Sequence, residues 1–149
     1  MRNLLQPVDR DDILRRLLDV SPDAQRRWGT MSVDQMLCHV ADQLRFAAGD
    51  LDAGAPSGAL TNPFVRWIAI AWMPWPPKLM IRTAPALLQT RPAELEADVR
   101  DLRALIERFA AKGSTGRFGA HPMFGRISNR LWGRLAWRHL DYHFRQFGV

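Results

Sequence analysis

The chain has 149 residues, of which 47% are hydrophobic and 24% are charged, so its composition excludes a fibrous or disordered protein. It contains a single cysteine, which excludes an internal disulfide and gives no sign of an oxidising compartment. The net charge of +6 comes mostly from arginines spread along the chain, so we expect no nucleic-acid partner. No secretory signal is recognised at the N-terminus and no apolar run approaches the roughly 20 residues that span a bilayer; we therefore expect a cytoplasmic protein with no membrane partner.

The first predicted element is a helix over 9–19. Its apolar residues recur at helical spacing, and aspartates near its start suit the positive end of the helix dipole. A Ser-Pro pair at 21–22 then resembles a helix cap followed by a first-turn proline. We expect a short turn there that ends near Trp28 and Gly29.

The second predicted helix begins at Ser32. Ser32 and Gln35 have the spacing of a capping box, in which each side chain binds the backbone N–H of the other residue. An apolar stripe follows, and Gly49 is suited to the C-terminal cap. The sequence therefore predicts a long helix between these two signals.

The middle of the chain has weaker patterns. A loop rich in Gly, Ala and Pro is predicted over 50–61, followed by a short helix over 64–73. The Trp-Pro-Pro run at 75–77 must end that helix. Residues 78–90 are interpreted as an irregular connection.

The last two helices are the longest. Apolar residues at steps of three and four predict one from Pro92 to just before Gly113, and residues 114–126 form a loop. The other begins after Ser128 as N-cap and continues to about Phe147. With no strand pattern, we predict one all-α domain over 1–149, with four main helices and a short extra helix or irregular segment between the second and third.

One face of the final helix changes from apolar to polar. It begins with Trp132 and continues with His139, Tyr142, His143 and Gln146. Unpaired polar groups in a core cost about 1–3 kcal/mol each, so these side chains need partners. The two histidines are four residues apart, which places both rings on one side of the helix and suits two nitrogens on one metal ion.

A third histidine lies on the second helix. His39 is at the edge of the apolar stripe and faces partly inward, so it can complete a three-nitrogen set that leaves open positions for water or substrate. The other interpretation is that these are core histidines bonded to carbonyl groups, with Asp42 or Asp141 nearby. Spacing alone does not separate the two interpretations.

Three further features have structural interpretations. His121 precedes a proline in a loop, where it is a candidate fourth ligand, although an anchoring role is favoured. Cys38 lies away from the histidine face and is interpreted as a packing residue. Trp67, Trp72 and Trp75 are clustered, which is typical of a pocket mouth or a dimer surface.

Several sequence runs resemble the DinB-like four-helix-bundle superfamily. They are WGTMS at 28–32, QMLCH at 35–39, HPMFG at 121–125, WG at 132–133 and HLDYHFRQFG at 139–148, the C-terminal ones resembling an uncharacterised branch. The resemblance implies an antiparallel four-helix bundle in which His39, His139 and His143 hold a metal ion. Many relatives have a histidine where this chain has Tyr142, but that neighbour is not usually a ligand. Homodimers are common in the superfamily, so we expect this chain to form a homodimer.

Some superfamily members are thiol-dependent transferases or hydrolases, while others have no known activity. We therefore expect a metal-dependent enzyme with Zn²⁺ or Ni²⁺, acting on a small-molecule substrate or low-molecular-weight thiol, with Tyr142 or Gln146 orienting the substrate or a bound water. The metal-facing stripe has no carboxylate as an obvious general base, which weakens hydrolysis and leaves thiol transfer open. The alternatives are a non-catalytic bundle that binds a metal or small ligand, and a purely structural core.

Overall fold

A computed structural model describes residues 1–52, 58–75 and 90–149, and its regular elements within these ranges are all helices. The predicted all-α class is therefore confirmed for this part of the chain. The elements are α1 (Pro7–Leu18), α2 (Val33–Ala48), the 3₁₀ helix η1 (Ala59–Thr61), α3 (Pro63–Ala71), α4 (Leu95–Thr115) and α5 (Asn129–Gln146). None of the described helices has the length and apolarity needed to cross a membrane.

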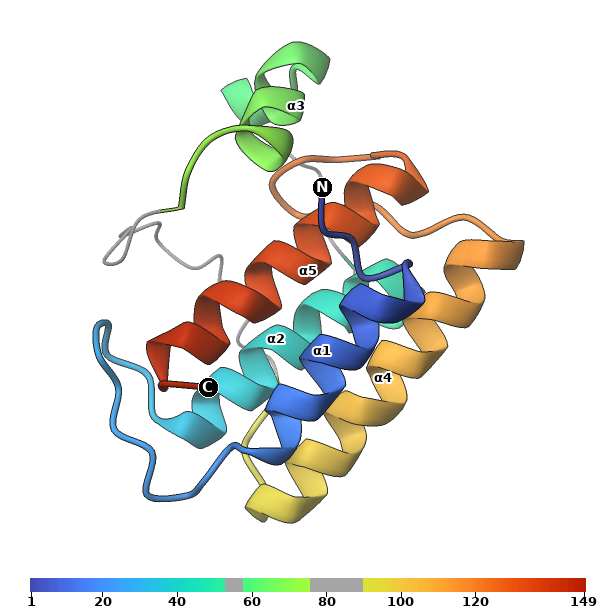
Figure 1. Cartoon of the computed structure of the whole chain (residues 1–149). Coiled ribbons are helices and arrows are strands. Elements are labelled where there is room, and N and C mark those ends of the chain that lie inside the picture. The colour runs from blue at the N-terminus through green and yellow to red at the C-terminus, as the bar shows by residue number, and fades with distance from the viewer. Residues whose placement is uncertain (53–57, 76–89) are drawn as a thin grey trace.

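The four long helices lie side by side, and α3 projects beyond one end of them (Figure 1). α2 packs against α4 and α5, and α1 packs against the same two helices. α3 packs on η1 and α5. The core lies between the long helices, where Phe46, Trp132 and Phe144 are fully buried.

Capping residues set the bounds of α2 and α5 as the sequence predicted. The Gln35 N–H donates to Ser32 Oγ at 3.3 Å, and the Ser32 N–H donates to Gln35 Oε1 at 3.0 Å. Gly49 ends α2 in the left-handed conformation, with φ of 87°. Ser128 Oγ accepts from the Leu131 N–H and starts α5. These caps fix the two helices that carry the histidines.

The other bounds differ from the predicted ones. α1 begins two residues earlier, because Pro7 is compatible with the first helical turn. α4 begins at Leu95 and not at Pro92, and it continues past Gly113 to Thr115. Gly113 is an interior residue of this helix whose missing side chain makes room for Leu5, so the glycine is a contact point and not a helix end.

The remaining predictions concern the connections. The Ser21 carbonyl accepts from the Ala24 N–H at 3.0 Å, so a turn forms there without a helix. The short helix is present as α3, which starts one residue earlier than predicted because Asn62 caps it and ends two residues earlier, at Ala71. The predicted connection over 78–90 lies outside the described residues, except for residue 90.

The N-terminal segment crosses α5 before α1 begins. The Leu4 N–H donates to the Gly133 carbonyl at 2.9 Å, and the Asn3 side chain donates to the Arg130 carbonyl at 3.0 Å. A Cβ on Gly133 would collide with the side chains of Asn3 and Leu5. The glycine therefore permits the close crossing that fixes the position of α5 next to α1.

Candidate metal centre

Three histidines from two helices meet in the core. α2 supplies His39, and successive turns of α5 supply His139 and His143. Their ring centroids are 4.7–4.8 Å apart in all three pairs. One ring nitrogen from each lies within 4.8 Å of those of the other two, so the structure brings together the three residues that the sequence singled out.

Burial keeps the imidazoles of His139 and His143 neutral. The exposed fractions are 4% for His39, 9% for His139 and 8% for His143. Burial lowers the pKa of His139 well below its usual value, and the neighbouring His143 and His39 lower it further. Burial and then His39 lower the pKa of His143 to about 3, against the opposing effect of its hydrogen bond to Gln146. Neutral imidazoles carry the lone pair that binds a metal ion.

Two glutamines fix the orientation of the rings. The Nδ1 atom of His139 lies 2.9 Å from Oε1 of Gln43, and the Nδ1 atom of His143 lies 2.8 Å from Oε1 of Gln146. An amide oxygen can only accept, so both Nδ1 atoms carry the proton and donate it. Each Nε2 atom is therefore left with its lone pair. Metal-binding histidines commonly have their second nitrogen held in this way.

The separation of the nitrogens is compatible with one shared ion. The Nε2 atoms of His39 and His139 are 2.9 Å apart. This is the length of a hydrogen bond, so one of the two Nε2 atoms donates to the other. Two imidazoles bound to one tetrahedral zinc ion at about 2.0–2.1 Å place their nitrogens roughly 3.3 Å apart, so a shift of a few tenths of an ångström would bring the pair to the spacing of two ligands on one ion.

Aromatic side chains form a wall beside the cluster. The Tyr142 ring lies 5.3 Å from that of His143, 5.6 Å from that of Trp28 and 6.2 Å from that of Trp75, measured between centroids. Gln146 binds the same wall, because its amide nitrogen donates to the Trp28 carbonyl at 2.6 Å. Within the described part of the chain, the indole N–H of Trp28 is buried without an acceptor. It is a donor available to a bound molecule.

A cavity of about 400 Å³ opens beside His39. Its described lining residues are Thr30, Met31, Gln35, Cys38, His39, Thr90, Arg91 and Pro92. Burial, then the negative charges of Asp98 and Asp42, raise the pKa of the Cys38 thiol to about 11. Cys38 is therefore a neutral thiol in the cavity wall, consistent with its interpretation as a packing residue.

The chain matches, over residues 2–148, the model of a family described as Protein of unknown function (DUF1569). It belongs to this family. No curated protein and no solved structure matches the chain. The DUF1569 match covers both histidine-bearing helices and the loop that contains His121, so the cluster lies wholly inside the family domain.

His121 of this DUF1569 protein lies outside the cluster. Its Nδ1 atom accepts from the N–H groups of Met123 and Phe124, at 3.1 and 3.3 Å. Burial lowers its pKa to about 3. The side chain thus holds the HPMFG turn in place, which confirms the anchoring role favoured from the sequence.

The two aspartates named with the histidines have other partners. Asp141 pairs with Arg16 at 2.9 Å and with Arg145 at 3.0 Å, so it joins α5 to α1. Asp42 is fully buried and accepts from the Thr90 N–H at 3.0 Å and from Arg45 at 2.8 Å. These bonds fix Thr90, which lines the cavity. The acceptors observed for His139 and His143 are glutamine amides.

Sequence reasoning missed Gln43 as a site residue. It lies four residues after His39, on the same side of α2, and is 3% exposed. A buried glutamine one turn from an inward-facing histidine was the available signal, since buried amides need partners. Tyr142 and Gln146, predicted to orient substrate or water, both lie next to His143; their catalytic roles stay predictions.

Proposed function

We propose that this DUF1569 protein binds one divalent metal ion through His39, His139 and His143, and that it is a metal-dependent enzyme acting on small molecules. One observation carries the proposal. Three buried histidines bring one ring nitrogen each within 4.8 Å of the others, while glutamines bind the second nitrogen of two of them. The glutamines thereby leave the Nε2 lone pairs of His139 and His143 for an ion, an orientation that a purely structural cluster does not need.

The donor set fits an ion of the zinc type. Imidazole nitrogens suit Zn²⁺, Ni²⁺ and related first-row ions, and three protein ligands leave positions open, as in catalytic sites. An ion held there would lower the pKa of a water or thiol bound to it and so supply a nucleophile near neutral pH. Zinc or nickel is our proposed cofactor.

The surrounding residues favour thiol transfer over hydrolysis. His39 belongs both to the cluster and to the wall of the cavity, which gives a small molecule a route to it. Among the described lining residues none is a carboxylate that could act as a general base. We therefore propose a low-molecular-weight thiol as co-substrate, with the Trp28 indole N–H and Tyr142 contacting the bound molecule.

We also propose that the four long helices form an antiparallel bundle of the DinB-like type. Their mutual packing and the position of the three histidines on α2 and α5 support this arrangement. Homodimer formation, common in that superfamily, stays a prediction that sedimentation equilibrium can test.

Metal analysis of protein without a histidine tag tests the site. We expect about one Zn²⁺ or Ni²⁺ per chain and a higher melting temperature when the ion is added to stripped protein. His139→Ala should lose both the ion and the shift in melting temperature. A folded His121→Gln variant should keep both, because His121 is outside the cluster. A wild-type protein that binds no ion would overturn the proposal.

The enzymatic part needs a separate test. The metal-loaded protein is assayed with low-molecular-weight thiols and electrophiles, and in parallel with amide and ester substrates. Turnover with a thiol that His139→Ala abolishes supports a transferase, and turnover of esters or amides supports a hydrolase. Tight metal binding without turnover in either panel favours the alternative, a non-catalytic metal-binding module.

A further inference from the structure

Acidic residues are distributed very unevenly along this chain. All 15 Asp and Glu residues lie in 1–52, in 94–107 or at Asp141. The segments 53–93 and 108–140 contain none, yet they carry eleven of the 21 basic residues. The net charge of +6 is therefore the sum of a strongly basic part and an acidic remainder.

The fold brings the described parts of these two acid-free segments together. Arg134 and Arg138 on α5 donate to the carbonyls of Ala71 and Ile70 at the end of α3, both at 2.7 Å. Arg66 on α3 donates to the Phe124 carbonyl at 3.2 Å. Within the described ranges, no arginine of these two segments other than Arg108 forms an ion pair with a carboxylate.

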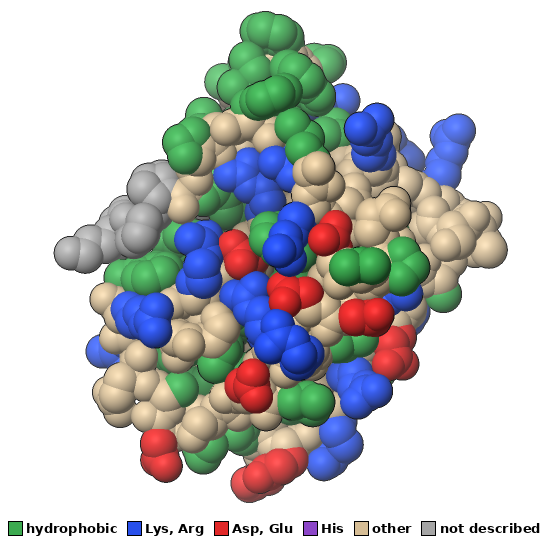
Figure 2. Space-filling view, viewed as in Figure 1, with side chains coloured by type: hydrophobic (Ala, Val, Ile, Leu, Met, Phe, Trp, Pro, Cys, Tyr) green, Lys and Arg blue, Asp and Glu red, His purple; other side chains and the backbone are tan. Residues whose placement is uncertain are grey.

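The same end of the molecule exposes large apolar side chains. Phe64 is 68% exposed and Trp72 is 62% exposed, although both are aromatic. We call the exposed set the α3 face; it consists of Phe64, Val65, Trp67, Trp72 and Met73. Figure 2 shows hydrophobic side chains gathered over α3 with basic side chains directly below them and acidic ones farther away.

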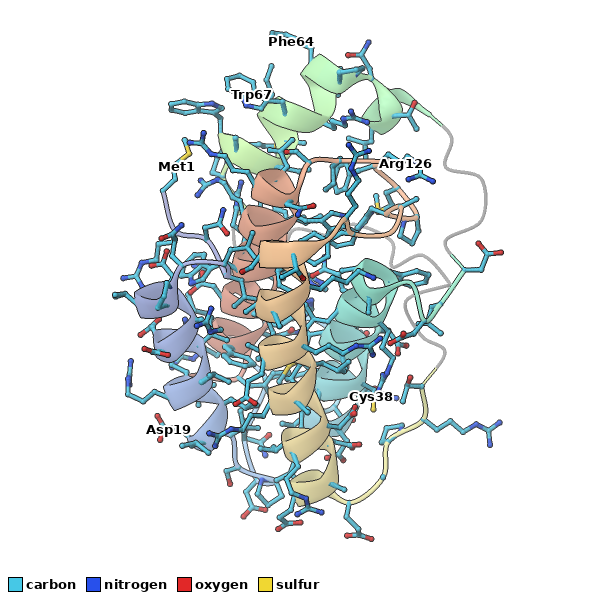
Figure 3. All side chains as sticks on the ribbon, turned by 90° about the vertical axis from the view of Figure 1, so that its right-hand side faces the viewer. Met1, Asp19, Cys38, Phe64, Trp67 and Arg126 are labelled. Carbon is cyan, nitrogen blue, oxygen red and sulfur yellow. The ribbon has the colours of Figure 1, made fainter. Side chains whose placement is uncertain are left out.

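A second view shows how far this end is from the acidic part. In Figure 3, Phe64 and Trp67 lie at the α3 end, with Met1 and Arg126 just below them, whereas Asp19 lies near the opposite end. Arg126 and Arg130 are exposed. The apolar α3 face therefore has arginines next to it, which we call the arginine collar: Arg66, Arg126, Arg134 and Arg138.

We propose that the α3 face binds the surface of an anionic lipid bilayer. Tryptophan is stable at the depth of lipid headgroups, where its apolar ring and its polar N–H are both solvated, and phenylalanine is stable with its ring buried at the acyl boundary. The arginine collar would contact lipid phosphates, since basic residues near an anionic leaflet are attracted to it. The sequence-based expectation of no membrane partner rested on the length of the apolar runs. That length decides whether a helix can cross a bilayer, but it does not decide whether a protein can bind to the bilayer surface.

The charge and the apolar surface of the α3 end argue against two other binding partners, a second copy of the chain and nucleic acid. A second copy bound through the same face would bring two basic collars together, and like charges repel. A nucleic-acid duplex would satisfy the arginines, but its bases are stacked on one another and would leave the exposed tryptophans and Phe64 in water. An anionic bilayer matches both the charge of the arginine collar and the apolar α3 face.

Vesicle binding of the full chain tests the proposal. Protein is sedimented with phosphatidylcholine vesicles that either contain or lack phosphatidylglycerol. We expect binding only to the anionic vesicles, with weakening at raised salt. Brominated lipids should quench tryptophan fluorescence in the bound wild-type protein, which reports contact without any substitution.

Two matched pairs of variants locate the contact. Trp72→Ser should weaken vesicle binding at least about tenfold, whereas Leu18→Ser, which removes an equally exposed side chain from α1, should not. Arg126→Gln should weaken it about fivefold, and Arg15→Gln should leave it unchanged. Melting temperatures confirm that each variant is folded.

Several outcomes would overturn the proposal. One is absence of binding to anionic vesicles and of quenching by brominated lipids. A second is equal loss of binding in Leu18→Ser and Trp72→Ser. A third is a dimer that Trp72→Ser dissociates, which would make the face a contact between copies. A fourth is DNA binding stronger than vesicle binding and unaffected by Trp72→Ser.

Discussion

Helix α2 carries two buried polar clusters about one turn apart, around His39 and around Asp42, and their polar groups find partners in different ways. Asp42 is bound by Arg45 and Thr90, so its charge and its acceptors are matched by residues of the chain. His39 faces His139 and His143, which are neutral and held by glutamines at the nitrogens pointing away from the cluster. The charge of the first cluster is matched within the chain, whereas the second holds three imidazole rings together and leaves the Nε2 lone pairs of His139 and His143 for a further partner.

This difference separates a structural polar cluster from a binding site. A buried carboxylate needs a cation and donors, and α2 and residue 90 provide them. In the histidine cluster, one hydrogen bond joins the Nε2 atoms of His39 and His139, whereas an ion between the three rings would bind a nitrogen of each. The comparison therefore predicts different responses to mutation in the two clusters.

The largest effect should come from Asp42→Ala. It leaves Arg45 and the Thr90 N–H without their buried partner, and breaking such a pair costs about 3–5 kcal/mol. The free energy of unfolding from urea titration measures this loss. Metal content per folded chain should not change; loss of metal at unchanged stability would show that the two clusters are not independent.

A smaller effect is expected from Gln43→Leu in the histidine cluster. The substitution removes the acceptor for His139 Nδ1, and losses of this kind weaken metal affinity about 10–100-fold. Competition with a chromogenic chelator measures the affinity. Gln43→Glu should restore it, because a carboxylate also accepts from Nδ1, and Gln25→Leu on the surface should have no effect. Equal affinities for the leucine variant and the wild type would refute the orienting role.

Acid should destabilise the metal-free protein through its buried histidines. The pKa of His121 is about 3 in the folded chain and about 6.5 when unfolded, so only the unfolded state takes up a proton between these values. The free energy of unfolding should fall as pH drops below 6.5, by about 1.4 kcal/mol per pH unit from His121. Urea titrations from pH 7 to pH 5 test this, and NMR of the His121 ring should show no protonation in that range.

The smallest effect should come from Asp101→Ala. Asp101 binds Arg45 from the outside of the Asp42 cluster, and its side chain is 49% exposed. Exposed ion pairs contribute about 0.2–1 kcal/mol, so the loss should be a fraction of that in Asp42→Ala. Urea titration of both variants side by side gives the ratio. Similar losses in the two would mean that burial does not set the energy of this network.

The helices were predictable where local chemistry determines them. The Ser32–Gln35 capping box, Gly49 and Ser128 act through bonds within a few residues, and the structure confirms each. Gly113 was misread as a helix end because its role depends on Leu5, a contact more than a hundred residues away in sequence. Such tertiary reasons for a glycine leave no local pattern.

The candidate site was predictable in its ligands and not in their support. The spacing of His139 and His143 on one helix face is a local property, and His39 was found through its stripe. Gln43 was missed because its partner is on another helix, ninety-six residues along the chain. The absence of acidic residues from 53–93 and 108–140 was missed because the prediction rested on the even spread of the arginines alone.

The hydrogen bonds from Arg134 and Arg138 to the α3 carbonyls couple α3 to the helix that carries two of the histidines. Arg138, which holds the α3 carbonyls and lies 4.6 Å from the Trp75 ring centroid, is the residue immediately before His139. Adjacent residues of one α-helical turn cannot shift separately. A displacement of α3 would therefore move Arg138 and, with it, His139 and the histidine cluster. Lipid bound at the α3 face should therefore change the affinity of the histidine cluster for a metal ion, and a bound ion should change the affinity of the α3 face for lipid. Thermodynamic linkage requires the two changes to be equal.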